Sequence, residues 1–162
     1  NDSIGILNMP SLVTQIMDVA ENRLRLMDSC SAVYRPNRKT DFQIKDSAVI
    51  LTHEDIESNE ELGAMGNPPK TAWILPLTVT CIVQPSKDDE IPIDERISDF
   101  VVEAMDALTD PQASWHTFDN LALNSVLTSP TSLEPSDDSA RAVSFGCRVT
   151  YRVDETSQTT QA

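Results

Sequence analysis

Two histidines and two runs of acidic residues are the side chains of this 162-residue chain that are best suited to metal chemistry. His53 and His116 are too few for a zinc site, because such a site needs three or four ligands at suitable spacing. His53 is followed by Glu54 and Asp55 in a polar segment, so we expect it to be solvated. His116 lies beside Trp115, and we expect it to pack or cap after a helix. The sequence therefore predicts no metal site.

The acidic runs at residues 54–61 and 88–95 lack the alternating oxygen ligands and central glycine of an EF-hand loop. We expect them to be solvated, with weak divalent binding as the alternative. The chain has four glycines and contains no G-x-S-x-G, no P-loop and no G-x-G-x-x-G. No serine has a histidine placed to suggest a dyad. We therefore predict neither a cofactor nor an enzyme.

The three cysteines are expected to be free thiols. Cys81 and Cys147 fall on the inward positions of predicted strands, where cysteine acts as a small hydrophobe. Cys30 is the third, and the odd count, the lack of CxxC and the lack of a signal-peptide pattern favour a reducing compartment over secretion. The apolar runs are only a few residues long, against the roughly 20 that span a bilayer, so no membrane partner is predicted.

The net charge of -14 is unevenly distributed along the chain. Residues 1–45 hold six basic and five acidic side chains, whereas the remaining 117 residues hold 6 basic and 21 acidic ones. A surface with this excess repels phosphate, because nucleic-acid affinity depends on lysine and arginine that replace counterions. Specific binding of DNA is therefore not expected. The alternative is that the acidity serves only solubility.

Two long segments alternate between apolar and other residues with a period of two, which is typical of strands with one face on a core. They are residues 73–83 and 143–153, with inward side chains at the odd positions. Pro76 interrupts the first segment, so this strand is expected at a sheet edge, at a bulge, or where the missing N–H faces outward. An exposed edge invites pairing with another chain.

Two amphipathic helices are predicted. The first begins between Asn8 and Ser11, with Arg23 and Arg25 outside its apolar stripe. Its stripe consists of Leu12, Val13, Ile16, Met17, Ala20, Leu24 and Met27. The second begins after Pro92 and ends at residues 110–111, and its apolar face consists of Ile97, Phe100, Val101, Ala104, Met105 and Leu108.

Residues 48–52 and 121–128 are expected to form two further strands, with Phe42 and Ile44 as an optional pairing upstream. Residues 54–69 and 129–140 are long polar loops. The sequence thus predicts a single α+β domain over residues 1–153. Its sheet has about four mainly antiparallel strands with two main helices packed on it and long polar hairpin loops. Residues 154–162 are expected to form a flexible C-terminal tail.

This order of elements resembles the tail terminator family of long-tailed bacteriophages, the small minor tail proteins that close the tail tube. The resemblance covers roughly residues 12–153 and has no strict signature. It rests on the strand at 48–51, the strand at 73–83, the helix after Pro92, the return from Trp115-His116 to Leu121, and the closing strand that ends Thr150-Tyr151-Arg152-Val153. The family has no catalytic motif to carry over.

The resemblance implies a structural virion protein that forms a ring, as a homohexamer, on the last ring of tail-tube subunits. Such a ring ends tube polymerisation and offers a docking surface to the head–neck complex. Its partners are copies of itself, the tube protein and a neck or head-completion protein, and DNA passes through it without specific binding. Assembly in the host cytoplasm and residence in the virion follow. Whether the tail is contractile stays open.

Candidate residues for the subunit or tube interface come from the one basic patch, the interrupted strand and the acidic loops. They are Arg35, Arg38, Lys39, Pro76, Glu57, Glu60, Glu61, Asp137 and Asp138. The three basic residues lie in a connector at residues 28–41, where docking on an acidic patch of a neighbouring copy and simple solvation are both open.

Two other functions remain open at this point. A different neck, tail-completion or head–tail joining protein has the same layout, and it would bind the portal side and not the tube. A small α+β ligand-binding module would be marked by a deep apolar pocket with a few polar groups.

Overall fold

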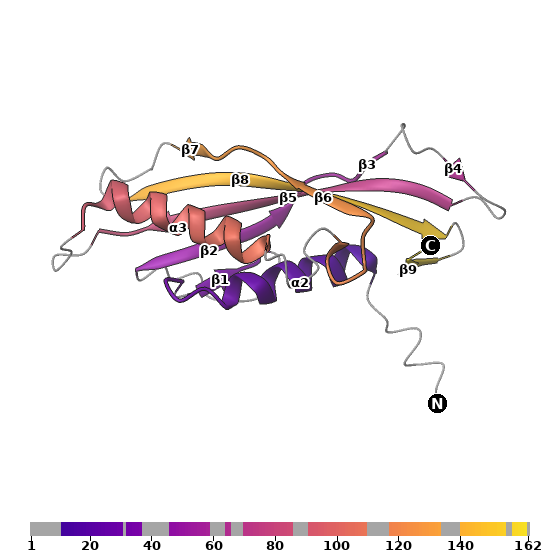
Figure 1. The fold of residues 1–162 in the computed structure, drawn as a ribbon, viewed down its shortest axis with the longest axis horizontal. Coiled ribbons are helices and arrows are strands. Elements are labelled where there is room, and N and C mark those ends of the chain that lie inside the picture. The colour runs from indigo at the N-terminus through magenta and orange to yellow at the C-terminus, as the bar shows by residue number, and fades with distance from the viewer. Residues whose placement is uncertain are drawn as a thin grey trace, which may run out of the picture.

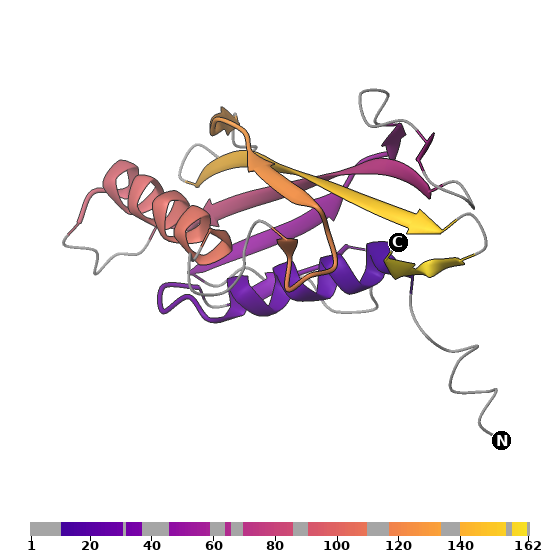
Figure 2. The same cartoon turned by 45° about the vertical axis from the view of Figure 1, so that its right-hand side comes forward.

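The computed structural model describes residues 11–30, 32–36, 46–58, 64–65, 70–85, 91–109, 117–133, 140–154 and 157–161. These residues form one α+β domain, in which two helices pack against a single sheet (Figures 1 and 2). The predicted fold class is therefore confirmed. The four predicted strands are present as β2, β5, β6 and β8, and short strands on both sides extend the sheet to nine.

The sheet is built on one long antiparallel pair, β5 (Lys70–Val83) and β8 (Arg141–Asp154). Their register runs from Lys70↔Asp154 to Val83↔Arg141 without a shift. Because β8 occupies one side of β5 along its whole length, the other strands attach outside this pair. β2 (Ser47–His53), β3 (Glu57–Ser58) and β4 (Ala64–Met65) follow one another along β5.

The outer side of β8 is lined in the same manner by three short antiparallel strands. They are β7 (Thr131–Leu133), β6 (Asn124–Leu127) and β9 (Ser157–Gln161). At the opposite edge of the sheet, β1 (Ala32–Tyr34) pairs with β2 and is parallel to it. The sequence does not predict β9, so the tail beyond Val153 contains a strand where none was expected.

Both helices lie on the same face of the sheet. α2 (Leu12–Arg25) begins at Ser11, whose side chain accepts a hydrogen bond from the Thr14 N–H at 3.2 Å. α3 (Ile93–Leu108) follows Pro92 and carries Asp94 and Glu95 in its first turn, where negative charge is favourable. Both helices therefore begin where the sequence predicts.

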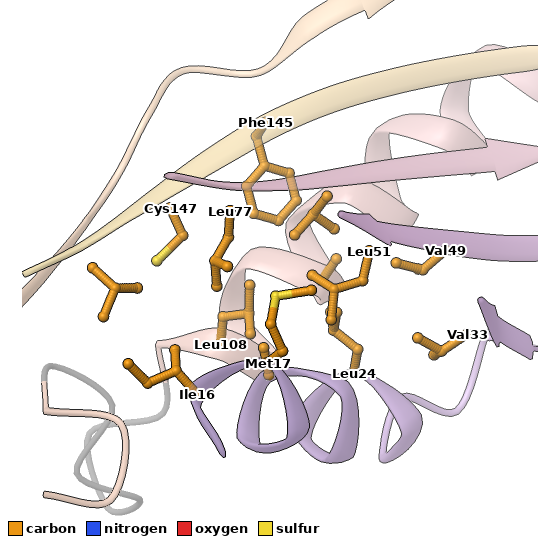
Figure 3. Close-up of a cluster of buried hydrophobic side chains, with 14 of the residues drawn as sticks. Ile16, Met17, Leu24, Val33, Val49, Leu51, Leu77, Leu108, Phe145 and Cys147 are labelled. Atoms are coloured by element: carbon orange, nitrogen blue, oxygen red, sulfur yellow. The ribbon is translucent and has the colours of Figure 1, made fainter. Parts of the chain in front are cut away.

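The core is formed by the inward side chains of the sheet and the apolar faces of the two helices. Figure 3 shows Met17 and Leu24 of α2 below Leu77 and Phe145 of the β5–β8 pair, with Leu51 of β2 beside them. The predicted period of two is confirmed, because the odd-numbered positions of β5 and β8 supply the core. Among them, Leu75, Leu77, Val79, Cys81, Val83, Phe145, Cys147, Val149, Tyr151 and Val153 are buried.

Pro76 lies in a central strand, so the edge position that it suggested is wrong. β2 ends its pairing at Leu77 and β3 begins its pairing at Ile74, which leaves Pro76 at the gap between them. The carbonyl of Pro76 accepts a hydrogen bond from the Glu54 N–H at 2.9 Å, so Pro76 faces the side of this gap. An N–H and a C=O of one strand residue point to the same side. The N–H that proline lacks would therefore point into this gap, where no partner strand requires a hydrogen bond from it.

Arg23 is buried, although the sequence places it outside the apolar stripe of α2. Its guanidinium donates to Asp119 Oδ1 at 2.8 Å and to the Leu108 carbonyl at 3.3 Å, and lies 5.1 Å from the centre of the Phe118 ring. Leu108 is the last residue of α3, where a cation is favourable. Arg23 thus joins α2, the end of α3 and the segment before β6.

That segment contains three consecutive residues in the left-handed region. Phe118, Asp119 and Asn120 have φ values of 46°, 58° and 71°. Asp and Asn tolerate this conformation, whereas an aromatic residue there costs about 1–2 kcal/mol. Burial of the Phe118 ring and its contact with Arg23 offset this cost. The turn therefore depends on Arg23 for its stability.

Replacement of Arg23 by Met is expected to lower the free energy of unfolding by about 2 kcal/mol, because it removes charge-assisted hydrogen bonds and the contact with Phe118. Urea unfolding followed by circular dichroism measures this change. Arg148→Met is the control, because Arg148 and its ion-pair partner Glu57 are both exposed. We expect a loss of less than about 1 kcal/mol there. Equal losses for both variants would contradict the role of Arg23.

Gly146→Ala is expected to cost about 1–2 kcal/mol of stability. A Cβ at this position would lie 2.8 Å from Thr128 Oγ1. That oxygen accepts a hydrogen bond from the Gly146 N–H at 2.7 Å, and the Thr128 N–H donates to the Gly146 carbonyl at 2.8 Å. Thr128 therefore has little freedom to move away. Ser144→Ala, two residues away on the same face, serves as the control with a change below about 0.5 kcal/mol, and an unchanged midpoint for Gly146→Ala would refute the close approach.

Candidate assembly surfaces

The face of the sheet opposite the helices is the first candidate surface (Figure 2). Neither α2 nor α3 packs on it, because the core residues of β5 and β8 all point the other way. We call it the helix-free face. Its side chains come from the even positions of three strands: Ala48, Ile50 and Thr52 of β2; Ala72, Ile74, Pro76, Thr78, Thr80 and Ile82 of β5; and Ala142, Ser144, Gly146, Arg148, Thr150 and Arg152 of β8.

Most side chains of the helix-free face are hydroxyl or aliphatic, and β8 adds Arg148 and Arg152. Thr80 and Ser144 face each other across the central pair with their hydroxyl oxygens 3.5 Å apart. Arg148 forms an ion pair with Glu57 of β3 at 2.5 Å. Such a face has no nucleophile with an adjacent base.

Most of the described arginines form ion pairs within the chain. Besides Arg148 with Glu57, the pairs are Arg23–Asp119, Arg25–Glu21, Arg35–Asp18, Arg96–Asp46 and Arg141–Asp94. Carboxylates that form none of these pairs include Glu54 and Asp55 after β2, and Glu95, Asp99 and Asp106 on the exposed side of α3. Of these, Glu54 lines a hollow on the helix-free face together with Thr78 and Arg148, whereas the carboxylates of α3 lie away from that face.

The predicted interface residues are placed at different parts of the fold. Glu57 is exposed on β3 and pairs with Arg148, whereas Pro76 is buried within β5. Arg35 is largely buried and pairs with Asp18 of α2 at 2.5 Å, so within this chain its charge is already balanced. Arg38, Lys39, Glu60, Glu61, Asp137 and Asp138 lie outside the described residues, as do His116, Phe42 and Ile44. Docking through these residues stays a prediction.

Short strands form the edges of the described sheet. β1 has three residues, β6 four and β7 three. At β1, the Arg25 guanidinium donates to the Val33 carbonyl at 3.2 Å, so the chain's own side chain occupies an acceptor of this strand. Short and covered edges limit strand addition by other chains. The sequence suggested pairing through an exposed edge at residues 73–83, and the structure places that strand in the centre.

The chemical side chains singled out by the sequence do not assemble into a reactive site among the described residues. His53 is exposed at the end of β2, with Nδ1 3.0 Å from the Glu54 carbonyl oxygen. No group of His, Cys, Asp and Glu within the described ranges is arranged to hold a metal ion. None of the helices in those ranges has the length and apolar character needed to cross a membrane.

All three cysteines are free thiols, as predicted. Burial raises the pKa of Cys81 to about 12 and that of Cys147 to about 12. Burial also raises the pKa of Cys30. Since the thiolate is the nucleophile, thiols with raised pKa values are inert near neutral pH. These cysteines therefore pack the core and do not act as nucleophiles.

An apolar groove of about 550 Å³ lies between α3 and the strands β7 and β8. Ile97, Val101, Val102 and Met105 form its helix side. Pro130, Leu133, Ala142 and Val143 form its strand side. Its charged lining residues, Asp94 and Arg141, bind each other at 3.0 Å. A small-molecule site places a few polar groups so that they converge on the ligand, and here the charged pair is already satisfied.

Comparisons with known proteins give little beyond the fold. No family model matches the chain, and no curated protein matches it in sequence. One similar solved structure is the sheath/tube terminator, in the extended state, of the PVC extracellular contractile injection system. The sequence identity is 11%, the TM-score is 0.43, and the match covers 93% of this chain and 60% of that chain. A likeness at this level says nothing about the activity of the present chain.

The buried thiols predict a loss of stability at alkaline pH. The folded pKa values of Cys81 and Cys147, about 12, lie above the ordinary value of 9.0 for a cysteine thiol. Their contribution is therefore fully present below pH 9 and is lost as the pH rises toward 12. Between pH 9 and pH 10 the free energy of unfolding should fall by about 1 kcal/mol per thiol. Urea unfolding at a series of pH values measures this slope.

The double variant Cys81→Ala, Cys147→Ala is expected to be less stable at pH 7 because it leaves cavities, and to show a flatter alkaline slope. Cys30→Ala is the matched control, since Cys30 is only half-buried. A slope that is the same in the double variant as in the parent chain would show that other groups control the alkaline transition.

Proposed function

We propose that the chain is a tail terminator, a structural virion protein that closes a phage-type tail tube as a ring of six copies. In this role it ends tube polymerisation and offers a docking surface to the head–neck complex. The resemblance of its sequence to that family motivates the proposal. The observation that carries it is the helix-free face, which has few unpaired carboxylates on a chain whose net charge is -14.

Assembly of like-charged copies requires a surface of this kind. Six copies would carry a formal charge of -84 (6 × -14), and exposed carboxylates that approach within the Debye length of about 8 Å repel one another. On the helix-free face Glu57 is balanced by Arg148, so contact there brings few unpaired carboxylates together. The face also supplies partly buried Ile50, Ile74 and Ile82, whose burial would favour association.

The contact that we propose is heterologous, so that the helix-free face of one copy meets a different surface of the next. Heterologous contacts close into a ring when the rotation between copies allows it. Edge pairing is a poorer basis for the ring, because the edge strands are short and Arg25 occupies the Val33 carbonyl of β1. The acidic remainder of the surface does not retain DNA, which is consistent with passage of DNA without specific binding.

Native mass is the first test of this proposal. A hexamer of the 17.9 kDa chain has a mass of about 107 kDa (6 × 17.9), and we expect this particle by light scattering after size exclusion. Because repulsion between carboxylates is screened by salt, the particle should become more abundant with added Mg²⁺ or NaCl. The double variant Thr80→Lys, Ser144→Lys should shift the mass toward the monomer, since it places two charges on the helix-free face.

A matched control separates position from charge. Leu26→Lys with Asp28→Asn raises the net charge by the same two units at the end of α2, away from the helix-free face, and should leave the particle intact. A monomer at every protein and salt concentration would overturn self-assembly in solution. A particle that binds the portal side and fails to shorten polymerising tubes would identify a neck or head–tail joining protein instead.

A further inference from the structure

The groove between α3 and the strands β7 and β8 contains exposed apolar side chains. Two large hydrophobic residues of its lining are exposed, Val102 on α3 at 55% and Leu133 on β7 at 43%. They lie on opposite sides of the groove, and its apolar lining includes Val101, Met105 and Val143. Adjacent exposed apolar residues that line one hollow mark an interaction surface more often than scattered ones do.

A ridge of carboxylates runs along α3 beside this groove. Glu95, Asp99 and Asp106 are exposed, and none of them forms an ion pair with the described residues. They are spaced four and seven residues apart, on the same stripe as Val102. Groove-lining Asp94 and Ser98 lie next to this stripe on the helix surface. The apolar groove is therefore bordered by negative charge along its helix side.

The ridge lowers the stability of the isolated helix. Carboxylates at positions i and i+4, as in Glu95 and Asp99, repel each other by about 0.2–0.5 kcal/mol. Asp106 lies in the last turn of α3, which contains no basic residue, and a negative charge there opposes the helix dipole. A cationic partner along this helix would remove both penalties.

We propose that this groove is a docking site for a protein segment that presents apolar side chains flanked by lysine or arginine. The apolar side chains would enter between Val102 and Leu133, and the cations would lie against Glu95 and Asp99. This is the arrangement by which an amphipathic helix binds a hydrophobic groove. The inference rests on the groove and its charges and is independent of whether the chain forms a ring.

A basic partner fits this surface better than a second copy or a lipid does. A second copy carries a net charge of -14, and six arginines in its described part are already in ion pairs with their own chain. Anionic lipid headgroups would be repelled by the ridge. Charge complementarity therefore favours a cationic protein segment.

The experiment uses two fluorescent 14-residue helical peptides with the same leucine face, one with lysine and one with glutamate at the other positions. Fluorescence anisotropy with the full chain should show that the lysine peptide binds at least about tenfold more tightly than the glutamate peptide, with an affinity that falls as salt is raised. Val102→Ser and Leu133→Ser should each weaken binding about tenfold, because each removes apolar contact inside the groove.

The chain supplies controls matched in exposure. Val126 is 56% exposed and Ile56 is 43% exposed, and neither lines the groove. Val126→Ser and Ile56→Ser should therefore leave binding unchanged. For charge, Glu95→Gln with Asp99→Asn should weaken the lysine peptide about fivefold and reduce its salt dependence, whereas Glu54→Gln with Asp55→Asn should have less than a twofold effect. Circular dichroism confirms that each variant is folded.

Three results would overturn the proposal. The first is absence of binding by the lysine peptide at low salt. The second is equal weakening by the groove variants and their exposure-matched controls, which would indicate attraction to the acidic surface alone. The third is tighter binding of the anionic dye 8-anilinonaphthalene-1-sulfonate than of the lysine peptide, with loss on Val102→Ser, which would identify a small-ligand site.

Discussion

The unbroken antiparallel pairing of β5 with β8 is the constraint on which the rest of the structure depends. Fourteen residues of each strand are paired without a register shift, so every inward and outward position along the sheet is fixed by this pair. A slip of one residue would move each strand's core residues to the other face. Attachment of β2, β3 and β4 on one side, and of β6, β7 and β9 on the other, follows from the two edges that the pair leaves available.

Because the helices cover one face only, the pair also decides where the molecule is apolar and where it is charged. The inward residues pack against α2 and α3. The outward ones, such as Thr78, Thr80 and Ser144, are partly exposed on the face that neither helix covers. Arginines link the periphery to the helices, as Arg35 does with Asp18 and Arg141 does with Asp94. The unbalanced carboxylates are left on α3 and the segment after β2. The concentration of unpaired carboxylates on α3, on the other side of the sheet from the helix-free face, is thus a consequence of one-sided burial.

The sequence predicted those elements whose pattern is long enough to repeat. The eleven-residue alternations within β5 and β8 and the apolar stripe of α3 each repeat over several periods, and each was confirmed. Strands of two or three residues, such as β3 and β7, have no period to detect, since their pairing is imposed by the long strands beside them. For Pro76 the sequence left an edge, a bulge or an outward-facing N–H open, and the structure excludes the edge. A gap between two partner strands satisfies the rule on proline as well as an edge does, because the rule concerns the missing N–H.

The candidate surfaces were harder to predict than the core, and for a different physical reason. Arg23 and Arg35 look alike in the sequence, yet one lies under Phe118 and the other pairs with Asp18 of α2. Which carboxylate each cation meets depends on tertiary placement, which composition does not contain. The same holds for the groove, where Val102 directly follows the buried Val101 and is turned about 100° from it around the helix. Leu133 lies in a strand that the sequence did not predict.

The acidic ridge of α3 lowers the stability of the unbound chain. Repulsion along Glu95 and Asp99, together with Asp106 at the C-terminal end, costs about 1 kcal/mol in sum. That is a noticeable part of the 5–15 kcal/mol by which domains of this kind are stable. Any partner that binds the folded chain and neutralises the ridge stabilises the fold by mass action. Binding at the groove and stability of α3 are therefore linked, and a bound cationic segment should protect the α3 amides from hydrogen exchange more than those of α2.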